Sequence, residues 1–296
     1  MHIAAILGPG NLAKPLAAFQ REANADWTSL IEQADVIVIF GGDGTIHHQL
    51  KTLVELDVPV LIVPCGGGND FARALGLRSF RDSISAWNKF NVGSKNVRSI
   101  DLGVIHQATK LGPVRVDSPG AYNSLNNGCH YFCCVAGVGL DAEITRRANT
   151  LPRWIRARGG YGMTAPREFI RFVPVPMRIS ENGFAPASFR PTTLAAVANA
   201  PSYGGGIKIA PRASMDDGKL DLCVVQAMSR FELFRLFPTV YSGRHVTLDK
   251  VDYVQTCSAR IETESPSDVY ADGEYVCQTP VEFTVAPKAL QVIVPE

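Results

Sequence analysis

A strand that runs directly into a glycine turn is the feature that most constrains this chain. Residues 36–40 read Val-Ile-Val-Ile-Phe, the apolar pattern of a buried parallel strand. The segment 41–45, Gly-Gly-Asp-Gly-Thr, follows, and its glycines let the backbone turn sharply and approach a ligand. We expect Thr45 to cap a helix over residues 46–56. A helix N-terminus behind such a turn binds anions, because its unpaired N–H groups point outward.

A second junction of the same kind follows. Residues 59–63 predict a strand, 64–68 (Pro-Cys-Gly-Gly-Gly) a turn, and 69–75 the start of a helix. Two turns at the carboxyl ends of neighbouring parallel strands would line one crevice. Either turn alone could be an ordinary tight βα turn. Because each is followed or interrupted by an aspartate, Asp43 or Asp70, the pair favours a nucleotide whose phosphates are bridged to carboxylate by Mg²⁺.

Composition agrees with a cytoplasmic enzyme. The 296 residues suffice for two domains, and a net charge of +1 gives no reason to expect nucleic acid as a partner. No apolar run approaches the roughly 18 residues of a membrane span, and the N-terminus lacks a signal-peptide pattern. The seven cysteines include no C-x-x-C pair, which favours reduced thiols. A metal site built from Cys129, Cys133 and Cys134 is the less favoured alternative.

The architecture is predicted to change near residue 98. Residues 1–98 alternate apolar strands with helical stretches, which predicts an α/β domain with a parallel sheet. Residues 99–296 hold short β-rich runs separated by Pro and Gly, with helical stretches near 141–172 and 230–242. This second domain is expected to be β-sandwich-like.

A set of motifs makes the chain recognisable. G-G-D-G-T at 41–45 and P-x-G-x-x-N-D-F-A-R at 64–73 are followed by G-V-G-L-D-A at 137–142. Later motifs are Y-G-G-G at 203–206, A-P-R-A at 210–213, D-G-K-L-D at 217–221, G-R-H at 243–245 and D-G-E at 272–274. In this order they resemble the diacylglycerol-kinase-like lipid kinases, relatives of sphingosine kinases and more distantly of NAD kinases. The resemblance implies two domains with a cleft between them, and a C-terminal segment returning to the first domain.

The resemblance implies transfer of the γ-phosphate of ATP, with Mg²⁺, to the hydroxyl of a lipid such as diacylglycerol. Asp43 and Asp70 are then candidates for holding Mg²⁺, and Glu274 for the catalytic base. From spacing alone, a surface charge on an Asp-Gly hairpin is the favoured interpretation of Glu274, because such turns are common; the resemblance reverses this preference. The residues expected to contact the nucleotide are Gly41, Gly42, Gly44, Thr45, Gly66, Gly67, Gly68, Asn69 and Arg73.

The D-G-K loop suggests a second metal. The resemblance implies a structural Mg²⁺ held by Asp217 and by the backbone carbonyls of Ser214 and Lys219. The alternative is an ordinary Asp-Gly turn. Arg73 could steady Asp70 or meet a phosphate, or lie on the surface of its helix.

Some positions depart from the family pattern. Gly67 replaces the usual Thr or Ser, which leaves open whether the nucleotide is ATP or another triphosphate. His47 and His48 stand where Asn and Glu are common, and we expect them to pack or face solvent, because neighbours on a helix diverge by about 100°.

Residues 146–171 carry seven arginines against one acid, Glu168, with Trp154, Tyr161 and Phe169 between them. This pattern predicts peripheral docking on an anionic membrane that weakens as salt rises, or else a solvated basic face.

Two other functions stay open, an NAD kinase and a non-catalytic nucleotide or lipid binder. The motifs do not identify the lipid, and the sequence does not predict the oligomeric state.

Overall fold

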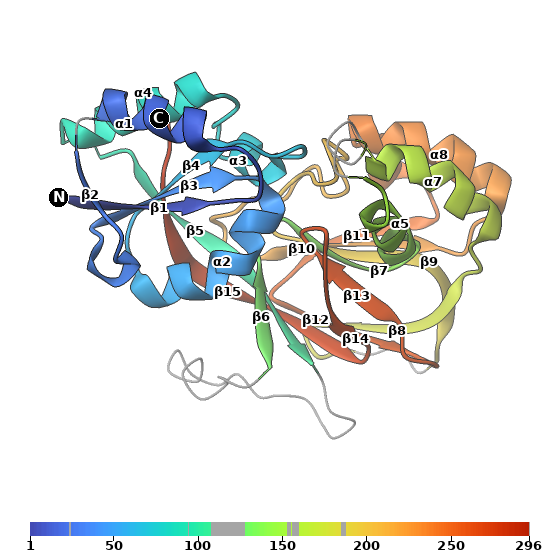
Figure 1. Cartoon of the computed structure of the whole chain (residues 1–296). Helices are drawn as coiled ribbons and strands as arrows, with labels where there is room; N and C mark the ends of the chain where they lie inside the picture. Colours follow the sequence, from blue (N-terminus) through green and yellow to red (C-terminus); the bar gives the residue numbers. More distant parts are fainter. Residues whose placement is uncertain are drawn as a thin grey trace.

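The fold is described from a computed structural model that covers residues 1–23, 25–93, 95–107, 128–152, 155, 160–184 and 188–295. Four strands near the N-terminus, in the order β2-β1-β3-β4, pair in parallel. In Figure 1, α1 and α4 lie on one side of these strands and α2 on the other. The elements are β1 (His2–Leu7), α1 (Ala13–Ala23), β2 (Asp26–Thr28), η1 (Ile31–Gln33), β3 (Val36–Gly41), α2 (Asp43–Leu56), β4 (Val60–Pro64), α3 (Asp70–Ala74) and α4 (Phe80–Asn91).

Strand β3 is buried along its whole length, because helices cover both faces of the sheet. Its last side chain before the glycine turn, Phe40, packs edge-on against Phe19 of α1, with ring centroids 5.6 Å apart. Burying a side chain of this size contributes about 1.5–3 kcal/mol. The strand therefore fixes the position from which the glycine turn begins.

The described residues from 97 onward form mainly antiparallel strands, with helices on one side of them (Figure 1). This α/β plus β-sandwich-like arrangement confirms the predicted fold class. The strand β5 begins at Val97, so it runs through the predicted boundary at residue 98. The elements are β5 (Val97–Gln107), β6 (Cys129–Phe132), β7 (Val135–Gly139), α5 (Leu140–Asn149), α7 (Gly160–Arg171), β8 (Val175–Glu181), β9 (Arg190–Ala198), β10 (Leu220–Gln226), α8 (Arg230–Ser242), η3 (Arg244–Thr247), β11 (Val251–Thr256), β12 (Ser258–Thr263), β13 (Asp268–Ala271), β14 (Glu274–Gln278) and β15 (Val281–Ile293).

The last strand, β15, connects the two regions. It pairs antiparallel with β5 over most of its length and with β12 near its start. At its end Val292 pairs in parallel with Val60 of β4, and both side chains are buried. The C-terminal strand thus extends the N-terminal parallel sheet by one strand.

Part of the arginine-rich segment lies outside the described residues. Among its members, Arg153, Trp154, Arg156, Arg158 and the side chain of Tyr161 are not described. The described remainder belongs to α5 and α7.

Candidate active site

The two glycine turns touch each other at the carboxyl ends of β3 and β4. A Cβ atom on Gly42 would lie 2.8 Å from the Cα of Gly66, and one on Gly66 would lie 2.5 Å from the Cα of Gly42. Asn69 shapes the second turn: its Oδ1 accepts the Gly66 N–H at 2.9 Å and its Nδ2 donates to the Gly66 carbonyl at 2.8 Å. The close approach explains why neither turn tolerates a side chain at these positions.

Helix α2 starts earlier than the sequence predicts. It begins at Asp43, with an extended Gly42 as N-cap, so the expectation that Thr45 caps the helix was wrong. The glycine turn closes directly into the helix, and the Thr45 N–H bonds to the Gly42 carbonyl at 2.9 Å. Thr45 lies in the first helical turn and still lines the cleft described below.

Asp43 links the two junctions. Its carboxylate accepts the N–H groups of Asp70 at 3.0 Å and Phe71 at 3.1 Å, so it caps helix α3 from a different part of the chain. Burial and the neighbouring Asp70 carboxylate raise the pKa of Asp43 to about 6, against the lowering effect of those two N–H groups. Two carboxyl groups that repel each other in a cleft form a site that favours a cation.

Asp70 joins the N-terminal region to the C-terminal one. It is buried, and it accepts the N–H of Gly205, in the Y-G-G-G motif, at 2.7 Å. Arg73 donates to Asp70 at 2.7 Å and to the Gly68 carbonyl at 2.5 Å, so in this structure it steadies Asp70 and the second turn. Burial raises the pKa of Asp70, while the Gly205 N–H and Arg73 oppose that rise.

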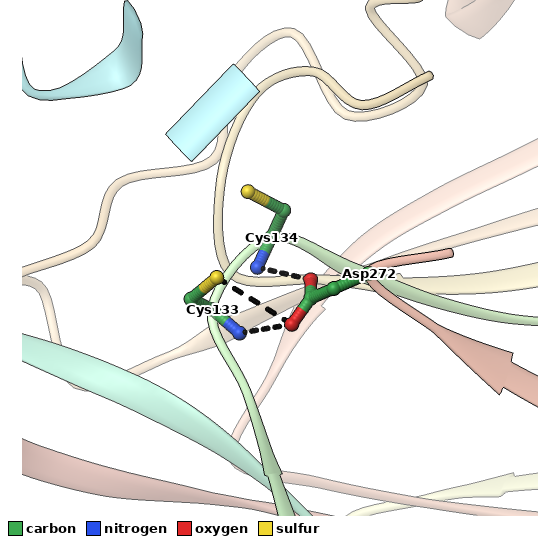
Figure 2. A group of neighbouring side chains, drawn as sticks. All are labelled: Cys133, Cys134 and Asp272. Carbon is green, nitrogen blue, oxygen red and sulfur yellow. Dashed lines mark hydrogen bonds between the residues drawn. The ribbon is translucent and has the colours of Figure 1, made fainter. Parts of the chain in front are cut away.

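Asp272 is the most heavily bonded acid of the site. Its carboxylate accepts the N–H groups of Cys133 and Cys134, each at 2.8 Å (Figure 2), and the N–H of Val135 at 3.3 Å. It also contacts His47 Nδ1 at 3.1 Å, which together with the nearby acids raises the pKa of that imidazole against the lowering effect of burial. The first acid of the D-G-E motif therefore fixes the turn between β13 and β14.

Glu274 extends from that turn toward the N-terminus of α2. A Cβ atom on Gly44 would lie 3.0 Å from Glu274 Oε1, so the carboxylate packs against the glycine turn. Its side chain is 37% exposed, and His48 Nε2 lies 4.0 Å from Oε2. Asn149, at the end of α5, donates to the Gly273 carbonyl at 2.7 Å and so supports the same turn.

These groups surround a cleft of about 650 Å³ lined by both glycine turns and the D-G-E turn. An adjoining pocket shares Asp43 and Asp272 with the cleft and adds Asp70, Tyr203 and Gly205. The predicted site residues that line one or both spaces are Gly41, Gly42, Asp43, Gly44, Thr45, Gly66, Gly67, Gly68, Asp70 and Glu274. Asn69 and Arg73 act behind them, on the second turn.

Asp217 lies elsewhere in the C-terminal region. Its Oδ1 accepts the Lys219 N–H and its Oδ2 accepts from Gln255 Nε2, both at 3.1 Å. The hydroxyl of Ser214 donates to Asp216 at 2.5 Å. This loop is distinct from the cleft, since none of the three predicted metal residues lines it.

The cysteines near the site form a hydrogen-bonded group. Cys133, Cys134 and Asp272 offer possible metal-ligand atoms within 4.8 Å of one another (Figure 2), whereas Cys129 is not part of this group. Burial raises the pKa of the Cys133 thiol well above its usual range, and the pKa of Cys134 rises to about 12 despite its bond to Cys133. Because thiolates bind metals and the Asp272 oxygens already accept N–H groups, the group is better explained as structural.

Sequence reasoning did not identify several of these contacts. It missed the N–H groups of residues 133–135 that the Asp272 carboxylate accepts. It also missed the Gly205 N–H that Asp70 accepts and the hydrogen bond from Asn149 to the Gly273 carbonyl. No motif singles out Asn149. The Y-G-G-G and D-G-E motifs did indicate the segments that hold Gly205 and Asp272, although not their partners.

The fold and the site together define a two-lobed nucleotide-dependent kinase. Residues 13–105 match the model of the diacylglycerol kinase catalytic domain, and residues 134–294 match the YegS C-terminal NAD kinase beta sandwich-like domain. The chain is 35% identical over 269 residues to a diacylglycerol kinase of Mycobacterium tuberculosis, covering 88% of this chain and 77% of that protein. It is 26% identical over 268 residues to a diacylglycerol kinase of Bacillus subtilis, covering 90% and 80%.

Solved structures show the same fold. A crystal structure from Bacillus anthracis has a TM-score of 0.72 over 99% of this chain and 95% of that chain, at 22% identity. Another, of a diacylglycerol kinase from the same organism, has a TM-score of 0.63 at 20% identity, covering 99% and 96%. The chain belongs to the diacylglycerol kinase family of lipid kinases, and this membership implies the use of ATP. No helix among the described residues is long and apolar enough to span a bilayer.

Proposed function

We propose that the protein is a magnesium-dependent kinase that transfers the γ-phosphate of ATP to the hydroxyl of diacylglycerol. The observation that carries the proposal is the position of Glu274, whose carboxylate packs against Gly44 at the mouth of a cleft lined by two glycine turns. The similarity to diacylglycerol kinases over most of the chain supports the acceptor.

In this reaction, different groups of the chain bind the phosphates, accept the proton and position the base. The N–H groups of the glycine turns and of the α2 N-terminus bind the phosphates. Glu274 accepts the proton of the lipid hydroxyl while the hydroxyl oxygen attacks the γ-phosphorus of ATP. The bond between the γ-phosphorus and the β–γ bridging oxygen breaks, and ADP is released. Asp272 holds Glu274 in place through its bonds to Cys133 and Cys134.

Asp43 and Asp70 fit a hard cation, because burial raises the pKa of both carboxyl groups and the Asp70 carboxylate raises that of Asp43 further. Mg²⁺ prefers a few carboxylate ligands beside phosphate oxygens. When bound there, Mg²⁺ would neutralise charge on the phosphates. We also infer a structural Mg²⁺ at the Asp217 loop. Adding Mg²⁺ should then raise the melting temperature of the wild type but not that of Asp217→Asn.

The test of the reaction is a phosphorylation assay with labelled ATP and two acceptors, diacylglycerol and NAD. Turnover of diacylglycerol alone is expected, and turnover of NAD alone would replace the proposal by an NAD kinase. Glu274→Gln should lower kcat on diacylglycerol by about 10²–10⁴-fold, because the general base is lost, with little change in the KM for ATP. Unchanged turnover in this variant would show that Glu274 is not the base.

A further inference from the structure

The outer side of helices α7 and α8 exposes several large apolar side chains. The α7–α8 face comprises Met163 and Ile170 of α7 and Phe231, Phe234 and Tyr241 of α8. Their exposed fractions are 64%, 51%, 70%, 43% and 45%. In each helix these residues are spaced by three, four or seven positions, so they share one side. A large exposed apolar patch marks a binding surface.

The two stripes lie side by side. The ring of Phe169 in α7 contacts Phe234 and Phe237 in α8, with centroids 5.5 Å and 5.1 Å apart. At the other end, a Cβ atom on Gly162 would lie 3.1 Å from the Tyr241 hydroxyl. The helices therefore run antiparallel and present one surface, next to each other over the C-terminal strands in Figure 1.

The charges around this surface are positive. Arg167 and Arg171 on α7 and Arg230 and Arg235 on α8 are all exposed, and the Arg235 guanidinium lies 5.9 Å from the Phe231 ring centre.

Each helix has one acid, and both are already engaged. Glu168 is only 12% exposed and lies 4.0 Å from Arg147, while Glu232 accepts from Lys250 at 2.7 Å and closes the N-terminal cap of α8 with Ser229. The exposed surface therefore combines apolar side chains with arginines, and the acid on each of the two helices is paired with a cation.

An apolar pocket lies directly beneath the same helices. It is lined by Ile144 of α5, Phe169 of α7 and Leu233 of α8, among other apolar residues, and it reaches Tyr203. Tyr203 also lines the pocket that contains Asp43 and Asp70. The α7–α8 face therefore covers apolar space that adjoins the candidate active site.

We propose that the α7–α8 face docks on an anionic phospholipid bilayer. Phe231, Phe234 and Ile170 enter the boundary between headgroups and acyl chains, and the four arginines bind lipid phosphates. The proposal rests on the proposed function, because it supplies the surface through which a membrane-bound lipid would reach the site.

A bilayer fits this surface better than a second protein. An apolar stripe flanked by exposed arginines, without free acids among the described residues of the two helices, is typical of helices that lie in a membrane interface.

The test is sedimentation of the full-length protein with vesicles of phosphatidylcholine, with and without phosphatidylglycerol. We expect binding that requires phosphatidylglycerol and falls as salt rises. Phe231→Ser should weaken it about tenfold, from loss of apolar burial. Arg167→Gln combined with Arg171→Gln should weaken it about 30-fold, at about 1 kcal/mol per cation. Matched controls are Phe184→Ser, at a ring that is 81% exposed on another part of the surface, and Arg81→Gln on α4.

A kinase assay separates this proposal from the reaction. With a short-chain diacylglycerol below its aggregation limit, Phe231→Ser should retain wild-type turnover, and it should lose activity only on vesicles. Glu274→Gln should lose both. The docking proposal is overturned if Phe231→Ser binds vesicles like the wild type, if Phe184→Ser weakens binding as much, or if the face instead mediates self-association that Phe231→Ser abolishes. If neither the wild type nor any variant phosphorylates the short-chain diacylglycerol, the proposed function is contradicted. The vesicle-binding result then tests the docking proposal by itself.

Discussion

Asp272 is the residue on which the position of Glu274 depends. Its carboxylate accepts three backbone N–H groups, from Cys133, Cys134 and Val135, and contacts His47. In Asp272→Asn, one oxygen is replaced by an NH₂ group that faces these donors. We expect a loss of about 2–4 kcal/mol in the free energy of unfolding, measured by urea denaturation, together with a fall in kcat. The control is Asp268→Asn, at the start of strand β13, which leads into this turn; it should change stability by less than about 0.5 kcal/mol. Equal stability of the two variants would contradict the assigned role.

Asp43 makes stability depend on pH in a predictable direction. Its pKa in the folded protein, about 6, lies above the ordinary value of 3.8, so the folded state holds the proton more tightly than the unfolded state. Its contribution is therefore fully present below about pH 4 and is lost as pH rises through 6. Because the residue retains some exposure, we expect a loss of about 2 kcal/mol over this range in magnesium-free buffer. Asp43→Asn should remove this part of the pH dependence, and an unchanged pH profile would contradict the shift.

At this scale the sequence predicts which acids line the cleft and the adjoining pocket better than it predicts the groups that support them. Asp43, Asp70 and Glu274 could be identified because each stands in a short motif next to glycines. The bond from Cys133 to Asp272 joins residues 139 positions apart, and nothing local in either segment indicates it. Supports of this kind depend on how distant strands pair, which a local pattern does not encode.

The N-terminus of α2 and the D-G-E turn form a contact between elements that a single methyl group can test. In Gly44→Ala, the new Cβ would lie 3.0 Å from Glu274 Oε1, which can move only by leaving its position over the helix. We expect kcat to fall about tenfold while the free energy of unfolding stays equal or rises by up to about 1 kcal/mol, because alanine favours the helix. Steady-state kinetics and urea denaturation measure the two effects.

Gly66→Ala is the contrasting variant. Its Cβ would meet the Cα of Gly42 at 2.5 Å, and backbone cannot move aside as a side chain can. We expect lower stability and a higher KM for ATP, because the two phosphate-binding turns must separate. If Gly44→Ala behaved in the same way, the contact with Glu274 would not explain its effect.

Elements were predictable where an apolar pattern was long and flanked by glycine. The strand predicted at 36–40 was identified close to its observed bounds, Val36–Gly41. The start of α2 was misplaced because Thr45 is a good cap by composition, whereas the extended Gly42 already supplies the N-cap. Strand β5 runs through the predicted boundary at residue 98, because residues on both sides of that boundary pair with β15.

Over the whole molecule, β15 makes the two regions depend on each other. Val292, fully buried, pairs with Val60 of β4, while the earlier part of the same strand pairs with β5 and β12. The division into 1–98 and 99–296 stays a prediction, but this pairing implies that the regions unfold together. We expect one coincident transition in urea by far-ultraviolet circular dichroism and by tryptophan fluorescence, since Trp87 is buried in the N-terminal region.

Val292→Asp tests this dependence directly. An unpaired carboxylate at a position with 0% exposure should remove about 3–5 kcal/mol, a large share of the 5–15 kcal/mol that stabilises a typical domain. Because both regions share this strand, the midpoints of the fluorescence and circular dichroism transitions should shift together to lower urea. ATP binding in the cleft should be lost at the same urea concentration as the circular dichroism signal. The matched control is Val254→Asp on β11, where the side chain is 36% exposed and a carboxylate can reach water. A variant in which fluorescence shifts alone while the circular dichroism of the antiparallel strands keeps the wild-type midpoint would show that the two regions fold independently despite the shared strand.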